Sequence, residues 1–218
     1  MTRHKLWPTY FLEEINPRHQ ELAPELRRYL YRFDKGTEQS TLGRALKHNI
    51  SEPPFNFLET ARDECAAFDK LISWIDRRMR SFLTPIISLA LDPGLRWSIC
   101  HCESWYHITK EGGFHCPHMH SNTSWGWIYY FDDVNIAKHG GSNRFYNPIS
   151  QHVTYVDVGL QYIETLDWSF LEVTPRAGKL VVYPGWLLHD GQPYFGKKDR
   201  LILSGNTRIL ELDQSPAE

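Results

Sequence analysis

Cysteine is scarce in this sequence. Its 218 residues include four cysteines, Cys65, Cys100, Cys102 and Cys116. Cys100 and Cys102 lie too close together for the usual zinc knuckle, and no second cysteine pair follows at zinc-site spacing. Free thiols in a reducing cytoplasm are therefore the simplest interpretation of this composition.

Long apolar segments are also absent. A transmembrane helix needs about eighteen or more predominantly apolar residues in succession, and no such run occurs. Residues 1–8 contain no apolar stretch of signal-peptide length. We therefore expect a cytoplasmic protein without a membrane segment.

Charge of one sign is not in excess. Lys and Arg number 24, Asp and Glu number 26, and the formal net charge is −2 at pH 7. This balance gives no electrostatic reason to expect nucleic acid or a membrane surface as a partner. The length is enough to bury one sizeable core. We expect a single domain over residues 1–218, in which residues 1–90 are largely helical support and residues 91–211 form the core.

The first third of the sequence predicts helices. Residues 21–33 carry apolar side chains near helical spacing, and residues 57–82 carry a longer apolar stripe. Pro85 follows the second stripe, and proline disfavours the interior of a helix. We therefore expect the second helix to end or to change direction at Pro85.

From about residue 96 the pattern changes to short strands. Alternating or apolar runs separated by turn residues predict strands over residues 97–108, 125–131, 144–146, 171–174, 179–183 and 200–207. Residues 111–113, Glu-Gly-Gly, predict a turn. Repeated short strands with turn signals between them favour a barrel or a sandwich.

Three histidines form the strongest candidate for a functional site. His118 and His120 are two positions apart, so in an extended segment both side chains point to the same face. His189 follows the predicted strand at residues 179–183, and closure of a barrel would bring it to the other two. Three imidazole ligands leave coordination positions open, as non-haem iron oxygenases require. Histidines in loops that only form hydrogen bonds are the alternative.

Arg200 is the second candidate, because a guanidinium binds a carboxylate through two hydrogen bonds. Tyr130 and Ser204 could add hydroxyl groups beside it. Together these side chains would form a site for a dicarboxylate. A structural or surface role for Arg200 is the alternative.

These segments resemble the 2-oxoglutarate- and Fe(II)-dependent oxygenase superfamily, in particular small bacterial and phage members of prolyl-hydroxylase type. In those proteins a His-x-His-Pro-Asn-Thr segment precedes a small residue and a Tyr-Tyr strand. Here His118-Met119-His120-Ser121-Asn122-Thr123 precedes Gly126 and Tyr129-Tyr130. Their second segment is an apolar strand, then Phe-Pro-Ser-Trp, then His. Here residues 178–189 read Gly-Lys-Leu-Val-Val-Tyr-Pro-Gly-Trp-Leu-Leu-His. Their final Arg-x-x-x-Ser-x-Asn strand matches Arg200, Ser204 and Asn206.

The resemblance implies an α+β, mainly β fold: a double-stranded β-helix of jelly-roll or cupin type under an N-terminal helical cover. It further implies Fe(II) bound by His118, His120 and His189 as the catalytic metal site. Arg200 would hold 2-oxoglutarate with help from Tyr130, Ser204 and Asn206.

The implied reaction uses dioxygen to hydroxylate an unactivated C–H bond of a small amino-acid-like or natural-product substrate, with release of succinate and carbon dioxide. We expect Trp105, His107, His115 and Trp127 to line the substrate pocket, although tryptophans also fill barrel cores. A homodimer is left open.

His120 departs from the usual superfamily pattern, which has Asp or Glu two residues after the first histidine. An imidazole there makes a ferrous site one unit more positive. One alternative is therefore a three-histidine dioxygenase that binds its substrate directly and does not use 2-oxoglutarate. His101-Cys102-Glu103 is a competing His-x-Glu motif. A non-catalytic metal-binding β-barrel is the third alternative, because fold alone does not imply catalysis.

Overall fold

The computed structural model describes residues 9–34, 47–51, 57–90, 96–148 and 170–212. The helices are α1 (His19–Tyr31), α2 (Phe57–Glu64), α3 (Ala66–Ala90) and α4 (Ile136–His139). The strands are β1 (Leu12–Ile15), β2 (Lys47–Ser51), β3 (Trp97–His118), β4 (Trp125–Tyr130), β5 (Asn143–Tyr146), β6 (Phe170–Val173), β7 (Lys179–Pro184), β8 (His189–Tyr194) and β9 (Arg200–Glu211). No helix in the described ranges is both long and apolar enough to cross a membrane.

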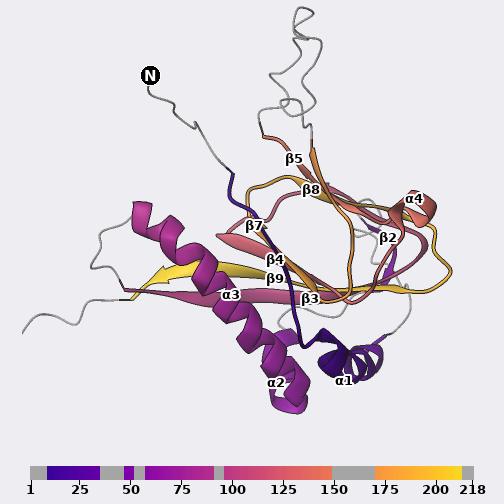
Figure 1. The fold of residues 1–218 in the computed structure, drawn as a ribbon, viewed down its shortest axis with the longest axis horizontal. Helices are drawn as coiled ribbons and strands as arrows, with labels where there is room; N and C mark the ends of the chain where they lie inside the picture. Colours follow the sequence, from indigo (N-terminus) through magenta and orange to yellow (C-terminus); the bar gives the residue numbers. More distant parts are fainter. Residues whose placement is uncertain (1–8, 35–46, 52–56, 91–95, 149–169, 213–218) are drawn as a thin grey trace, which may run out of the picture.

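The strands form one curled antiparallel sheet. Their order is β1-β7-β4-β9-β3-β8-β5-β6, and β2 pairs with β3 in addition. The sheet closes into a half-barrel, and α1, α2 and α3 pack outside one wall of it (Figure 1). This is a mainly β fold of jelly-roll type, a double-stranded β-helix with a helical cover, as the sequence predicts.

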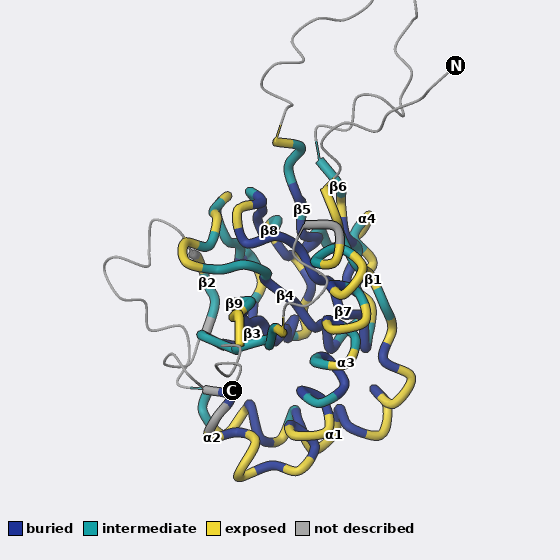
Figure 2. Tube along the Cα trace, turned by 90° about the vertical axis from the view of Figure 1, so that its left-hand side faces the viewer, coloured by how far each residue is buried: buried dark blue, intermediate teal, exposed yellow. Residues whose placement is uncertain are grey.

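Side-chain alternation along β4 separates two apolar clusters. Trp127 and Tyr129 point towards the helices and join what we call the helix-side core, which includes Phe68 and Leu71 of α3. Ile128 and Tyr130 point the other way, into a smaller interior cluster that also contains Phe145, Val181, Tyr183 and Ile202. Buried residues lie along the sheet and on the inner sides of the helices (Figure 2). The interior cluster is the wall on which the candidate site is built.

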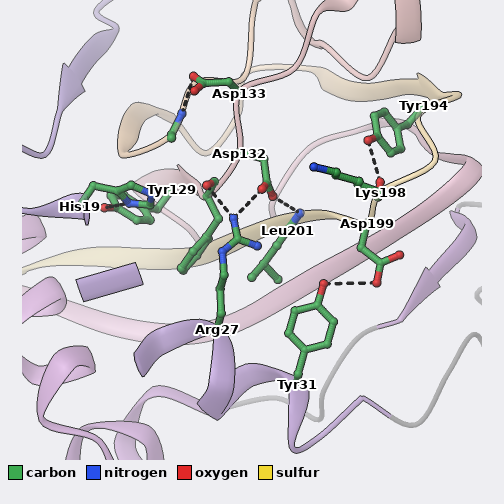
Figure 3. Close-up of polar contacts among 12 residues, drawn as sticks. His19, Arg27, Tyr31, Tyr129, Asp132, Asp133, Tyr194, Lys198, Asp199 and Leu201 are labelled. Carbon is green, nitrogen blue, oxygen red and sulfur yellow. Dashed lines mark hydrogen bonds and ion pairs between the residues drawn. The ribbon is translucent and has the colours of Figure 1, made fainter. Parts of the chain in front are cut away.

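Helix α1 is attached to the sheet by polar contacts at the end of β4. Arg27 donates hydrogen bonds to the Phe131 carbonyl and the Asp132 carboxylate, and Asp132 also accepts from the backbone N–H of Leu201 in β9 (Figure 3). His19 lies 2.8 Å from the hydroxyl of Tyr129. These contacts fix the helical cover against the strands that carry the site.

The helical region differs from the prediction in three respects. The stripe over residues 57–82 is two helices, which meet at Cys65. The prediction that Pro85 ends or redirects the helix is wrong, since α3 continues through it to Ala90. Burial of the apolar face of α3, including Ile75 and Met79, outweighs the one backbone hydrogen bond that a proline removes. In addition, β1 and β2 are strands within a region expected to be largely helical.

Strand β3 contains the predicted turn and changes partner there. It pairs with β9 up to Thr109, opposite Arg200, and with β8 from Gly113, opposite Tyr194. Residues 111–113 therefore do not reverse the chain; they form an irregularity inside β3. Gly112 has φ +79°, a conformation that glycine adopts without strain. This irregularity lets one long strand span both walls of the half-barrel.

Substitution of Trp127 tests the division of the apolar residues into a helix-side core and an interior cluster. Its side chain is fully buried, and it packs on Gly205 of β9, where an added Cβ would lie 2.5 Å from the indole ring. We expect Trp127→Ala to lower the free energy of unfolding by about 3–5 kcal/mol, because it empties a large volume in the helix-side core. Trp186 is 52% exposed. Trp186→Ala, the control, should change the free energy of unfolding by less than about 0.5 kcal/mol. Urea unfolding measures both, and equal stability of the two variants would contradict this packing.

Candidate metal centre and its pocket

Three histidine side chains converge at one end of the half-barrel. His118 ends β3 and His189 begins β8, and the two residues are paired in the β3–β8 register. His120 follows β3, and its backbone N–H donates to the carbonyl of Gly185, 2.9 Å away, in the turn after β7. The side-chain nitrogens available for metal binding all lie within 4.8 Å of one another. Backbone pairing alone thus brings together residues about seventy positions apart in sequence.

Backbone carbonyls orient two of the three rings. Nδ1 of His189 lies 2.9 Å from the carbonyl oxygen of Leu187, and Nδ1 of His118 lies 2.9 Å from that of Cys116. A carbonyl can only accept, so each Nδ1 carries a hydrogen, and in the neutral form of either ring the lone pair is on Nε2. Nε2 of His120 lies 3.2 Å from Nε2 of His189. This is the arrangement in which metal-binding imidazoles are usually held.

The charge state of His189 also suits a metal ligand. Burial lowers its pKa well below the ordinary value, and the neighbouring His118 and His120 lower it further. His189 is therefore neutral at pH 7 and has a lone pair to donate. Neutral imidazoles suit ferrous iron and other first-row transition metals, so the residues present fit such an ion.

A buried arginine lies in the same pocket. Arg200 is 4% exposed, and it donates a 2.7 Å hydrogen bond to Oδ1 of Asn143. The same oxygen accepts from the hydroxyl of Tyr130 at 2.9 Å, while Nδ2 of Asn143 donates to the Asp190 carbonyl. Nε of Arg200 has no hydrogen-bond partner in the described part of the chain. A buried cation without a carboxylate partner is costly, so this pocket favours an anionic ligand.

Two further side chains complete the wall. The carboxylate of Asp190 accepts hydrogen bonds from Tyr146 at 2.6 Å and from Gln192 at 2.7 Å, and these two bonds fix its position. The hydroxyl of Tyr183 lies 3.2 Å from Nε2 of His189. Burial raises the pKa of Tyr183 and of Tyr130, so both hydroxyls stay protonated.

Most of the predicted site residues line one pocket. They are His118, His120, His189, Arg200, Ser204, Trp105, His107 and His115. Tyr130 lies behind this wall and reaches it through Asn143. Asn206 is not among the lining residues; it donates to Glu103 at 2.7 Å. Trp127 is also not part of the pocket, because it points into the helix-side core.

The competing histidine motif lies elsewhere. His101 forms a 2.7 Å contact with Asp76 of α3, on the helical side of the sheet. The register of β3 shifts between His101 and Glu103, so the two side chains are not presented together as a regular strand would present them.

Three residues around the site, Asn143, Tyr183 and Asp190, are not predicted from the sequence. Asp190 directly follows His189, and Tyr183 stands in the quoted segment before it. Asp190 and Tyr183 therefore lie close in sequence to a predicted site residue. Their contacts, however, depend on how β5, β7 and β8 pair. Asn143 follows a Gly-Gly-Ser turn signal and gives no chemical signal of its own.

Comparison with known proteins supports this assignment of the fold. Residues 103–206 match the family described as "Putative 2OG-Fe(II) oxygenase". No curated protein sequence is similar enough to count as a relative.

Several solved structures have the same fold. A prolyl-4-hydroxylase from Pseudomonas putida is 17% identical, with a TM-score of 0.61 and 92% of both chains covered. HygX from Streptomyces hygroscopicus, with nickel and 2-oxoglutarate bound, is 12% identical, with a TM-score of 0.59, 91% of this chain covered and 82% of that one. The viral collagen prolyl hydroxylase of Paramecium Bursaria Chlorella virus-1 is 12% identical, with a TM-score of 0.55 and coverages of 91% and 96%.

The matched region contains the histidine triad and Arg200, and the chain has the fold of these enzymes. Residues 103–206 of the chain therefore match the 2OG-Fe(II) oxygenase family, and the fold around them is the one these enzymes have.

Proposed function

We propose that His118, His120 and His189 hold Fe(II) and that Arg200 holds the distal carboxylate of 2-oxoglutarate. The observation that carries this proposal is that Arg200 is buried, in the same pocket as the three imidazoles, and pairs with no carboxylate among the residues that the structure describes. A dianion that bound the metal at one end and Arg200 at the other would neutralise both.

The protein side of the mechanism is orientation and exclusion of water. When bound, ferrous iron and 2-oxoglutarate supply the oxidising chemistry, in which dioxygen is consumed and succinate and carbon dioxide are released. The carbonyls of Leu187 and Cys116 fix the imidazole tautomers. Asn143 fixes the guanidinium of Arg200 and is itself held by Tyr130. Ile128 and Ile202 add apolar side chains to this wall, which lowers the local dielectric constant and strengthens the charge interactions in the pocket.

We further propose that the substrate is a small amino-acid-like or natural-product molecule and that the outcome is hydroxylation. Among the similar structures, HygX has been solved with hygromycin B, whereas the viral protein is by name a collagen prolyl hydroxylase. The fold therefore does not choose the substrate class. The support comes from the pocket, whose wall includes Trp105, His107 and His115, and from the absence of a strong charge bias over the whole sequence.

Location and assembly remain predictions. The four cysteines are free thiols, which suits the reducing cytoplasm that the sequence predicts. A homodimer stays open.

A three-histidine dioxygenase that uses no 2-oxoglutarate is the second candidate. His120 in place of a carboxylate favours it, since no carboxylate joins the histidine group in the described residues. Arg200 and its Asn143–Tyr130 support favour 2-oxoglutarate instead, although they could hold the carboxylate of a substrate.

Removal of a proposed ligand tests the metal site. His120→Ala and His189→Ala should each weaken Mn(II) binding by about a hundredfold or more, because changes to groups that only orient a ligand already cost about 10–100-fold. Calorimetric titration of the apoprotein with Mn(II), an air-stable substitute for Fe(II), measures this. The matched control is His101→Ala, which should leave the affinity unchanged. Loss of affinity in the control alone would transfer the site to the competing motif.

Arg200→Gln tests the second half of the proposal. The affinity of the Mn(II)-loaded protein for 2-oxoglutarate should fall by at least about tenfold, because a hydrogen bond to a charged group contributes about 1.5–3 kcal/mol. Affinity for Mn(II) itself should not change. Arg144, on β5 next to Asn143, pairs with Glu172 and does not line the pocket. Arg144→Gln should therefore bind 2-oxoglutarate as the parent does, and equal affinities in all three proteins would contradict the role of Arg200.

A further inference from the structure

The hydroxyl of Tyr183 occupies an unusual position. It belongs to β7, is fully buried, and lies 3.2 Å from Nε2 of His189. This is the hydrogen bond that the structure gives to this hydroxyl. Its acceptor is therefore the atom that we propose as a metal ligand.

Nε2 of His189 cannot serve the hydroxyl and a metal at once. Its Nδ1 already points at the Leu187 carbonyl, so the ring has one lone pair, on Nε2. When that lone pair binds a metal, the hydroxyl of Tyr183 loses its acceptor. A buried hydroxyl without a partner is unfavourable, so the loaded site must supply another acceptor.

Within the described part of the chain, the structure gives the Tyr183 hydroxyl no hydrogen-bond acceptor other than His189. The nearest rings around Tyr183 are those of Phe145, His189 and His120, with centroids 4.8, 4.7 and 6.4 Å away. Oδ1 of Asn143 already accepts from Tyr130 and Arg200. An oxygen atom of a ligand held at the metal is left as the partner.

Space for the hydroxyl is provided by Gly126. This glycine is paired with Tyr183 in the β4–β7 register, and an added Cβ would lie 2.7 Å from Cζ and 2.9 Å from the hydroxyl oxygen. The end of the tyrosine side chain therefore occupies space that only glycine leaves open.

We propose that the hydroxyl of Tyr183 donates a hydrogen bond to an oxygen atom of 2-oxoglutarate held at the metal, and that Tyr183 is thus a residue that positions this ligand. The inference rests on the proposed function, since it requires 2-oxoglutarate in the pocket. Tyr183 lines the same pocket as Arg200 and the three histidines, so it can contact a ligand that spans them.

The test compares Tyr183→Phe with Tyr129→Phe in two titrations, first with Mn(II) alone and then with 2-oxoglutarate on the Mn(II)-loaded protein. Tyr129 is the matched control, because its buried hydroxyl bonds to His19 on the helical side of the sheet. Tyr183→Phe should bind Mn(II) within about twofold of the parent and 2-oxoglutarate about tenfold more weakly. Tyr129→Phe should match the parent in both. Gly126→Ala, which displaces the hydroxyl, should show the same selective loss.

Three outcomes would overturn the inference. Unchanged 2-oxoglutarate affinity in Tyr183→Phe would remove the ligand contact, and weaker Mn(II) binding would show that the hydroxyl merely orients His189. In both cases the parent still binds 2-oxoglutarate, so the proposed function survives. A parent protein that binds Mn(II) but not 2-oxoglutarate would overturn the inference and the proposed function together.

Discussion

The site depends on the change of partner within β3. The strand pairs with β9 as far as Thr109 and with β8 from Gly113 onward, and this places His118 directly opposite His189. The first pairing sets Thr109 opposite Arg200, so one strand fixes both ends of the pocket. Strand pairing can shift only by whole residues. A shift of β3 by one residue would turn the side chains of His118 and its neighbours to the other face of the sheet. The irregularity at residues 111–113, where the partner of β3 changes, is therefore part of what positions the site.

Charge complementarity explains why a site without a carboxylate ligand can still be built here. The metal centre has neutral imidazole donors, and the pocket also holds the buried cation Arg200. The carboxylate of Asp190, which could have offset this charge, is held by Tyr146 and Gln192 instead. The pocket with a bound metal thus carries positive charge at two places. A dianion such as 2-oxoglutarate would compensate both, and the proposed Tyr183 contact would add a hydrogen bond to it.

Much of this arrangement could be predicted from the sequence, because the signals are local. The two-residue spacing of His118 and His120 and the strand periodicity that places Arg200 need no knowledge of distant residues. The features that depend on how strands distant in sequence pair with one another could not be predicted. Strand β8 lacks an apolar run, so the sequence does not predict it, and Glu-Gly-Gly in β3 has the composition of a turn. Trp127 carries no signal that distinguishes pocket from core, since its side is decided by how β4 pairs with β7 and β9.

The most direct test of the central claim is an anaerobic titration of the Fe(II)-loaded protein with 2-oxoglutarate, followed by visible absorption. If the three histidines hold iron and 2-oxoglutarate chelates it, a weak visible charge-transfer band should appear and saturate as 2-oxoglutarate is added. Iron that stays tightly bound while no band appears at any 2-oxoglutarate concentration would contradict the account. That result would favour a three-histidine dioxygenase, in which Arg200 holds the carboxylate of the substrate.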